Sequence, residues 1–503
     1  MEKAKNNSDI KKLASQTAVY GIPTIVGRFL NYFLVPLYTY NIATQDYGVV
    51  SELYAYVSFL MIILTYGMET AFFRFSQDYD KSKVYNTALF SLMTSTTLFL
   101  IITFSSLSPI ASAMDYANHK TYIALFLVIL ALDALRAIPY ALLRRENKAK
   151  RFAFVKSVDI FSNIIFNLFF IVLCPLLYNK GYVFITKWFN PNDLVLYIFL
   201  SNCLASLTAF LLLMPQFLQF RWQIDFKVLK KMLLYGFPVM IGGLAGMINE
   251  TFDRIALKHL VSVPNNIVET EQIASYKMSQ IGIYGACYKL SIVISLFIQA
   301  FKFAAEPFFF SKMKQTDAQK SYSEIMTVFV MFLCFVFLLV MGYIDIFQYF
   351  IGVDYRVGIA IVPVLLMANI FLGIYYNLSI WYKVSDKTKY GAYIALIGAV
   401  ITLLGNYFLV PVMGYKGAAW TTLICYFSIS LLCYLLGQKY YPVNYKLKRI
   451  FFYILFALVL YLIMFYVQKV FQNTFIHIAI NTILIGIYVV VSYFSNRQNL
   501  FKK

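Results

Sequence analysis

The chain has 503 residues, of which 61% are hydrophobic and only 13% are charged. A soluble protein carries roughly a quarter charged residues, so this composition excludes a water-soluble fold and indicates a chain surrounded by lipid. The formal net charge of +20 falls in short stretches between apolar runs, which favours loop charges that set membrane topology over a surface for nucleic acid.

Fourteen apolar runs follow one another along the chain, each long enough to cross a bilayer, which takes about 20 residues. The first run comes after sixteen polar and basic residues and is too long for the apolar part of a signal peptide, so we interpret it as a retained helix. The predicted spans are 17–40, 47–73, 85–110, 121–143, 152–178, 194–215, 232–257, 283–310, 323–349, 357–382, 390–411, 415–437, 450–468 and 475–495.

The basic residues are distributed unevenly between alternate loops. The N-terminus, the even-numbered loops and the C-terminus hold 29 of the 43 Lys and Arg residues, the odd-numbered loops hold 8, and 6 lie within spans. Lys and Arg favour cytoplasmic loops, and a missed span would invert the bias further along the chain. We therefore predict an even number of spans and both termini in the cytoplasm.

Short motifs recur between the two halves of the chain. The motif at 20–23 (YGIP) returns at 235–238 (YGFP), 215 residues later. A Tyr-Gly pair that precedes a glutamate by 22 residues occurs at 47–69 and again at 284–306, now 237 residues apart. The change in spacing indicates an insertion of about 22 residues at 262–280, which we predict to be a loop. Asn167 and Asn406, 239 residues apart, continue the series.

The repeat starts from the same side of the membrane each time, so the two copies are expected to be parallel. We predict an all-α membrane protein with about fourteen transmembrane helices, in two pseudo-symmetric six-helix lobes followed by two C-terminal helices. The alternative is that membrane helices resemble one another through composition alone. The predicted parts are 1–220, 221–440 and 441–503.

The sequence resembles the polysaccharide flippases of the multidrug/oligosaccharidyl-lipid/polysaccharide (MOP) exporter superfamily. The resemblance extends over essentially the whole chain and rests on loose motifs at 66–75 (YGMETAFFRF), 282–290 (GIYGACYKL), 306–309 (EPFF) and 414–419 (GYKGAA). It implies two lobes around a central cavity and a location in the bacterial inner membrane. It also implies that an oligosaccharide on undecaprenyl pyrophosphate crosses from the cytoplasmic to the periplasmic leaflet for surface polysaccharide assembly.

The same resemblance implies the molecular partners of the chain. They are the lipid-linked oligosaccharide and the surrounding membrane lipids, with a polysaccharide polymerase and glycosyltransferases as candidate protein partners and no nucleic acid. No cofactor is expected, although coupling to Na⁺ or H⁺ is left open.

Ionisable residues within the spans are the candidate site residues, because each costs about 2.5–3.5 kcal/mol at the centre of a helix and needs a partner or a cavity. Cations suit a pyrophosphate, which a guanidinium binds through two hydrogen bonds. The candidate cavity cations are Arg28, Arg254, Lys289 and Lys302. The alternative for Arg28 is a side chain that reaches toward the membrane surface or pairs across helices, and for Arg254 and Lys302 it is a local pair with Glu250 and Glu306 on the same helix.

A second group of charged residues is assigned to ion coupling or gating. Glu250 and Arg254 are four residues apart and can pair on one face, as can Lys302 and Glu306, while Asp133 and Arg136 are favoured as a structural pair. Gating is considered for the two charges near the cytoplasmic end of the second span. The complete group is Glu69, Arg74, Asp133, Arg136, Glu250, Asp253 and Glu306.

Enzyme chemistry has little support in the sequence. The six cysteines lie in apolar segments without a CxxC pair, the three histidines are far apart, and no HExxH, Walker A or GxSxG motif occurs, so neither a metal site nor a catalytic site is expected. The longest outer loop, predicted at 258–282, is too short for a transferase or polymerase domain. The closer rivals are a flippase for the peptidoglycan lipid precursor and a cation-coupled multidrug antiporter.

Overall fold

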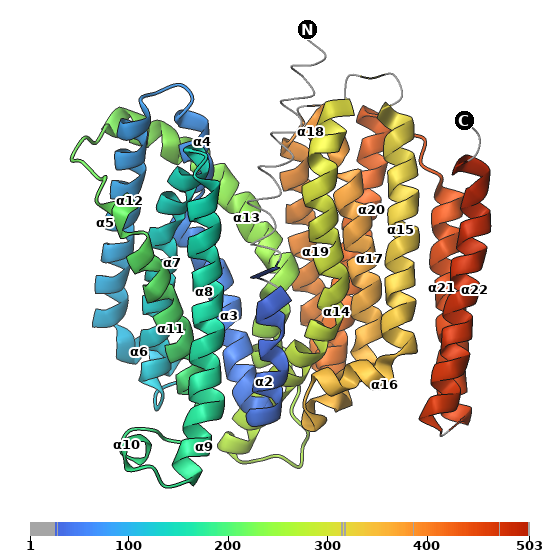
Figure 1. The fold of residues 1–503 in the computed structure, drawn as a ribbon, viewed down its shortest axis with the longest axis horizontal. Helices are drawn as coiled ribbons and strands as arrows, with labels where there is room; N and C mark the ends of the chain where they lie inside the picture. Colours follow the sequence, from blue (N-terminus) through green and yellow to red (C-terminus); the bar gives the residue numbers. More distant parts are fainter. Residues whose placement is uncertain are drawn as a thin grey trace. The chain divides into compact units, whose positions relative to one another are not determined.

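The computed structural model describes residues 26–27, 29–312, 315, 318–385, 387–471 and 473–500. It gives the backbone but not the side chains at 303–304, 306–307, 310–311 and 496–500. Within these residues every regular element is a helix (Figure 1). This confirms the all-α prediction, and it follows from the apolar composition, because a helix satisfies its backbone hydrogen bonds internally when lipid surrounds it.

Thirteen helical segments of the described chain are long and apolar enough to cross a membrane, and they coincide with the second to fourteenth predicted spans. The first predicted span, 17–40, lies partly outside the described residues, and α2 (Leu34–Asn41) covers its end. The thirteen segments are Thr44–Phe75, Lys81–Ser105, Lys120–Arg145, Ala149–Asn179, Leu194–Leu212, Phe226–Leu260, Thr270–Lys302, Ala318–Gly342, Val353–Val384, Lys389–Met413, Tyr415–Tyr440, Leu447–Val470 and Thr474–Ser495.

The described chain divides into two compact units. Unit 1 comprises residues up to Lys258 together with Ile267–Gly282, and unit 2 comprises His259–Asn266 and Ile283 onward. The predicted lobes at 1–220, 221–440 and 441–503 stay a prediction, since compact units of this kind do not define functional lobes.

Unit 1 is built around α7 (Lys120–Arg145). The helices that pack against α7 include α3 (Thr44–Thr65), α4 (Met68–Phe75), α5 (Lys81–Ser105) and α11 (Leu194–Leu212). The last of these also packs against α8 (Ala149–Leu168), which continues through a π-helical turn at Phe169–Leu173 into α9 (Cys174–Asn179). The unit also contains α6 (Leu107–Ala113), α10 (Val183–Thr186), α12 (Met214–Phe217) and most of α13 (Phe226–Leu260).

The second predicted span is interrupted in the structure. Tyr66 and Gly67 both have positive φ angles, 31° and 71°, so α3 ends at Thr65 and α4 begins at Met68. A β-carbon at Gly67 would lie 2.6 Å from the carbonyl oxygen of Gly236 on α13. Glycine is therefore needed here both for the left-handed backbone and for the close approach of α13.

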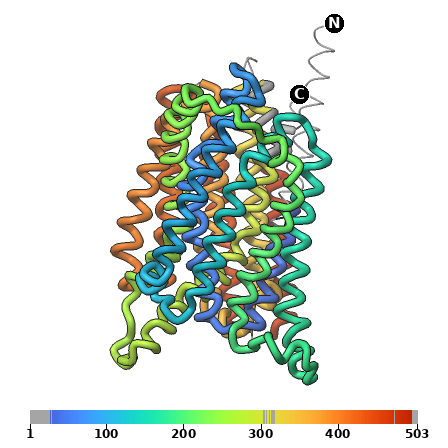
Figure 2. Tube along the Cα trace, turned by 90° about the vertical axis from the view of Figure 1, so that its left-hand side faces the viewer, coloured from blue at the N-terminus to red at the C-terminus, as the bar shows by residue number. Residues whose placement is uncertain are grey.

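Unit 2 packs α17 (Val362–Leu378) and α19 (Lys389–Met413) against α20 (Tyr415–Tyr440), and α19 and α20, the orange helices, lie side by side in Figures 1 and 2. The C-terminal helices α21 (Leu447–Val470) and α22 (Thr474–Leu500) pack against each other and against α15 (Ala318–Gly342). Short helices complete the unit at Ile344–Phe347 (α16), Gln348–Phe350 (η2), Val353–Ile361 (η3) and Ile380–Val384 (α18).

Packing in the two units repeats as the sequence motifs do. In unit 1 the sixth predicted span, α11, packs against α7 and α8, and in unit 2 the twelfth, α20, packs against α17 and α19. The matched residues Asn167 and Asn406 are both fully buried, and each donates a hydrogen bond of 2.8 Å to the carbonyl group four residues earlier. The two residues that the sequence repeat matches therefore form the same local hydrogen bond in both halves of the chain.

The prediction of a loop at 262–280 is wrong for most of this stretch. Helix α14 spans Thr270–Lys312, so only a short connection separates it from α13. The polar residues of this stretch begin the helix before its apolar part, and hydropathy alone identifies only the apolar part. Gly282 explains the close packing of this extension on α3, because a β-carbon there would lie 1.9 Å from the carbonyl oxygen of Thr44.

Candidate functional site

The C-terminal half of α13 carries a continuous set of buried charges in unit 1. Asp253, Arg254 and Lys258 are all less than 10% exposed, in a segment that the basic-residue count assigns to the outer side of the membrane. Arg254 and Lys258 are four residues apart and so share one face of the helix. Charges buried to this degree need partners, and the structure supplies a different partner for each cation.

Lys258 forms the centre of what we call the Glu52–Lys258 cluster, which consists of Glu52, Asp115, Tyr116 and Lys258. The Lys258 ammonium lies 3.0 Å from Glu52 Oε1 and 3.4 Å from Asp115 Oδ2, and it donates a hydrogen bond of 2.6 Å to the Met114 carbonyl. The Tyr116 hydroxyl donates to Glu52 Oε2 at 2.5 Å. The Glu52 carboxylate is completely buried, so its charge is balanced inside the protein rather than by water.

Tyr116 contributes to this cluster in two ways. Its ring faces the Lys258 ammonium, with 4.9 Å between the nitrogen and the ring centroid. Burial of the side chain, and next the Glu52 carboxylate beside it, raise the pKa of Tyr116 well above its ordinary value. The hydroxyl therefore stays protonated and acts as a hydrogen-bond donor to Glu52.

Arg254 pairs with its neighbour in the sequence. Its Nη1 donates to Asp253 Oδ1 at 2.7 Å and to the Glu250 carbonyl at 2.8 Å. The ion pair of Arg254 is thus with Asp253, in place of the predicted pair with the Glu250 carboxylate. Glu250 contributes its backbone carbonyl, and its side chain is exposed. The reason is local, since the Asp253 carboxylate also accepts the backbone N–H of Arg254 at 2.9 Å and is held beside the guanidinium.

A second buried group, the Arg136 cluster, consists of Asp133, Arg136, Lys156, Asp159 and Ser206. The structure contains the favoured pair of Asp133 and Arg136 and adds Asp159, whose Oδ1 accepts from Arg136 Nη1 at 3.1 Å. Ser206 donates to Asp133 at 2.8 Å, and Lys156 lies 3.7 Å from Asp159. Two acids and two bases give no net charge, which suits a group that joins α7, α8 and α11 within the membrane.

Glu69 and Arg74 lie on α4 and are paired, but not with each other. Glu69 accepts from Arg144 at 2.6 Å, and Arg74 bonds to Asp78 at 2.5 Å. All four side chains are between 44% and 51% exposed. Exposed pairs contribute at most about 1 kcal/mol and are readily broken, so a gating role for Glu69 and Arg74 stays a hypothesis.

The remaining candidate cations belong to unit 2 or lie outside the described residues. Arg28 is outside them, and the side chain of Glu306 is also not described, so its predicted pair with Lys302 falls there too. Lys289 and Lys302 both lie on α14, partly buried, and the Lys302 ammonium faces the ring of Tyr376 at 4.8 Å. Thirteen residues of helix separate the two lysines by about 20 Å, so one pyrophosphate cannot contact both at once.

Sequence reasoning missed Glu52, Lys156, Asp159 and Lys258. The signal was present, because the first three are ionisable residues inside predicted spans and Lys258 follows directly after one. Among the described residues no group of three or more His, Cys, Asp or Glu side chains could hold a metal ion. The arrangement of these clusters can balance charge and exchange ionic partners within the membrane, and the clusters themselves offer no set of groups for bond-breaking chemistry.

The sequence pattern of a family described as "Polysaccharide biosynthesis protein" matches residues 13–314, which is more than half of the chain. No curated protein matches the sequence.

Several solved structures share the fold. The lipid II flippase MurJ in an inward closed conformation has a TM-score of 0.72 at 16% identity, with 96% of this chain and 99% of that chain covered. An inward-facing multidrug resistance MATE family transporter of the MOP superfamily has a TM-score of 0.53 at 14% identity, covering 86% and 93%. A MATE structure in the straight conformation has a TM-score of 0.55 at 12% identity, covering 86% and 95%. Identities this low show a shared fold alone.

Proposed function

Because the chain belongs to the Polysaccharide biosynthesis protein family, we propose that it moves an oligosaccharide linked to undecaprenyl pyrophosphate from the cytoplasmic to the outer leaflet for surface polysaccharide assembly. The family match over residues 13–314 is the observation that carries this proposal. The chain is a multi-pass membrane protein with the fold of the MOP transporters, and the families it resembles are transporters and flippases rather than enzymes. In the proposal it resides in a bacterial inner membrane with both termini in the cytoplasm.

The proposed mechanism is alternating access, with the head group passing through the protein while the polyprenyl tail stays in lipid. Arg28, Arg254, Lys289 and Lys302 replace the water around the phosphates. The distance between Lys289 and Lys302 along α14 makes these contacts successive. Arg254 would exchange the Asp253 carboxylate for phosphate, which a guanidinium binds with the same fork of donors.

Ion coupling belongs to the same proposal. Asp133, Glu250 and Asp253 are the candidate Na⁺ or H⁺ sites, and two of them are held by an arginine. An ion that binds there has to compete with Arg136 or Arg254, so binding would open the ion pair. The exposed carboxylate of Glu250 does not carry this constraint.

A peptidoglycan lipid-precursor flippase is the second candidate, favoured by one observation. The fold likeness to the lipid II flippase covers 96% of this chain, whereas the likeness to the two MATE structures covers 86%. A multidrug antiporter is less well supported, because helices α21 and α22 follow the twelve spans of the two predicted six-helix lobes.

Transport in proteoliposomes would test the proposal. Purified protein is reconstituted with a fluorescent oligosaccharide on undecaprenyl pyrophosphate, and a membrane-impermeant glycosidase reports how much substrate reaches the outer leaflet. We expect release to rise with protein content, and parallel assays use a lipid II analogue and a cationic dye. Movement of lipid II alone would favour the second candidate, and transfer of sugar without translocation would refute a transporter.

A further inference from the structure

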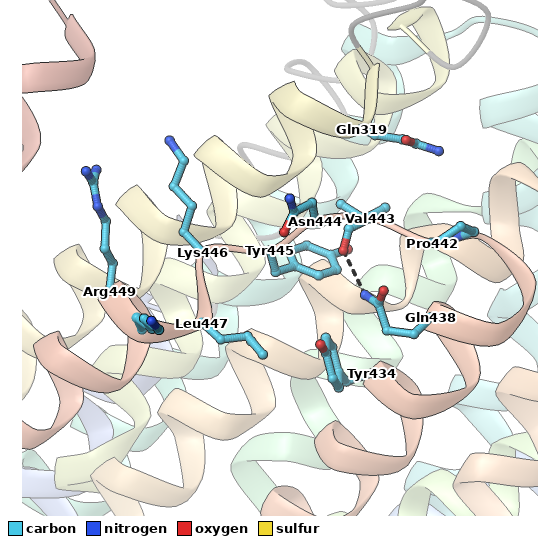
Figure 3. Close-up of a pocket in the computed structure, with 11 residues that line it drawn as sticks. Gln319, Tyr434, Gln438, Pro442, Val443, Asn444, Tyr445, Lys446, Leu447 and Arg449 are labelled. Atoms are coloured by element: carbon cyan, nitrogen blue, oxygen red, sulfur yellow. Dashed lines mark hydrogen bonds between the residues drawn. The ribbon is translucent and has the colours of Figure 1, made fainter.

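A pocket of about 720 Å³ lies in unit 2, where the end of α20, the start of α15 and the linker into α21 meet (Figure 3). Neither Lys289 nor Lys302 is among the residues described as lining it. None of the eleven residues described as lining it is acidic, and three are basic. The lining residues that carry the argument below are Tyr434, Gln438, Tyr445, Lys446 and Arg449.

The linker that forms one wall of this pocket is fixed by hydrogen bonds. Gln438 donates to the Val443 carbonyl at 2.7 Å, which is the dashed line in Figure 3, and Ser323 on α15 donates to the Asn444 carbonyl at 2.8 Å. Tyr445 is buried, and burial raises its pKa above the ordinary value. The wall is thus a built surface that presents its basic residues from fixed backbone positions.

The positive charge of the pocket is only partly balanced. Lys446 has one acidic partner among the described residues, Glu324 on α15, at 3.6 Å, and these side chains are 30% and 44% exposed. Arg449 Nη1 is buried and has no hydrogen-bond acceptor within the described part of the chain. In Figure 3 the side chains of Lys446 and Arg449 extend in the same direction from the chain. A buried guanidinium nitrogen without an acceptor indicates that an anion completes the site.

We propose that this pocket binds the phosphate of an acidic phospholipid, with Lys446 and Arg449 as its main contacts. The site lies at the ends of membrane-spanning helices, on the side that the basic-residue count assigns to the cytoplasm. Basic pockets between helices on that side suit lipid phosphates, and tyrosines such as Tyr434 sit well at the level of the head groups. The bound lipid would link α15 to α21 and so hold the C-terminal helix pair in place.

Native mass spectrometry of the full chain in detergent would measure this binding, with phosphatidylglycerol and phosphatidylcholine titrated in parallel. We expect phosphatidylglycerol to bind more tightly. The Lys446→Gln/Arg449→Gln variant should reduce this preference about twenty-five-fold, since each cation near the surface contributes about fivefold. The preference is a ratio between two lipids on the same protein, so partial unfolding of the variant does not imitate its loss.

The Lys227→Gln/Lys230→Gln variant is the matched control. It removes the same charge from exposed residues near the start of α13, on the same predicted side of the membrane, and should keep the preference. Equal loss in both variants would show general attraction to acidic lipid and overturn the site. Equal binding of both lipids would overturn it as well. Inorganic phosphate is titrated in the same way. If it binds as tightly as phosphatidylglycerol, the pocket is a site for a soluble anion instead.

Discussion

Replacing Lys258 with methionine tests whether the Glu52–Lys258 cluster is a closed ion pair on which unit 1 depends. The substitution keeps much of the side-chain volume and removes the charge that lies 3.0 Å from Glu52 Oε1. At an effective dielectric constant of about 20, charges at this distance attract by about 5.5 kcal/mol. With Glu52 fully buried, we expect Lys258→Met to lower the free energy of unfolding by about 3–5 kcal/mol.

Removing the charge of the partner, Glu52, should lower the free energy of unfolding by less. In Glu52→Gln the Lys258 ammonium keeps the Met114 carbonyl at 2.6 Å and the Asp115 carboxylate at 3.4 Å, so the expected loss is about 1–3 kcal/mol. The double variant buries neither charge and should lose much less than the two single losses added together.

Unfolding of the four proteins in mixed micelles, followed by circular dichroism during a titration with SDS, gives the coupling energy. We expect at least about 2 kcal/mol of coupling, within the range for residues in contact. The exposed pair of Arg74 and Asp78 is the control, and Arg74→Gln with Asp78→Asn should show less than about 1 kcal/mol. Additivity within about 0.5 kcal/mol at Glu52 and Lys258 would refute the reasoning.

Three further predictions address other features of the chain. Arg136→Gln leaves the carboxylates of Asp133 and Asp159 without their shared partner, so we expect the free energy of unfolding in the same titration to fall by about 3–5 kcal/mol. A second substitution, Asp159→Asn, should partly restore it, and no restoration would contradict the pairing. Gly48→Ala places a β-carbon 2.0 Å from the Met278 carbonyl oxygen and should lower the unfolding midpoint. Gly246→Ala, whose β-carbon has nothing within 4 Å, should leave the midpoint unchanged. Equal effects of the two substitutions would argue against close packing of α3 and α14. Collapsing an inside-negative potential in the transport assay should slow export, because each negative charge moving outward gains about 2.3 kcal/mol per 100 mV, and an unchanged rate would exclude an electrical contribution.

The membrane spans could be predicted because their signal is local and one-dimensional. Apolar residues over a bilayer length identify a span whatever it packs against, so the thirteen described spans are where hydropathy places them. The two errors have a tertiary origin. The break at Tyr66–Gly67 depends on the approach of Gly236, and the helix at 270–282 depends on packing against α3 at Gly48 and Gly282.

The ion pairs show the same division between local and distant signals. Asp133 and Arg136 are three residues apart on one helix, and their pairing could be expected from spacing. Glu52 and Lys258 are 206 residues apart in the sequence, and only the packing of α13 within unit 1 brings them together. Helical spacing favours Glu250 over Asp253 as the partner of Arg254. Spacing does not reveal that the Asp253 carboxylate accepts the backbone N–H of Arg254 and so stays beside its guanidinium.

The pairing of Arg254 changes what a phosphate-binding role would require of it. A cation that already has a carboxylate at 2.7 Å does not attract a phosphate as strongly as an unscreened one would, because the incoming group must displace Asp253. The exchange replaces one charge-assisted hydrogen bond by another of similar strength, so its net free energy is small. A carrier needs contacts that are strong enough to admit its cargo and weak enough to release it. A pre-paired arginine in the C-terminal half of α13 meets this requirement better than an unpaired one, and Asp253→Asn should therefore tighten substrate binding while it slows release in the transport assay. Faster release in this variant would contradict this reasoning, and unchanged binding and release would show that Asp253 holds Arg254 for stability alone.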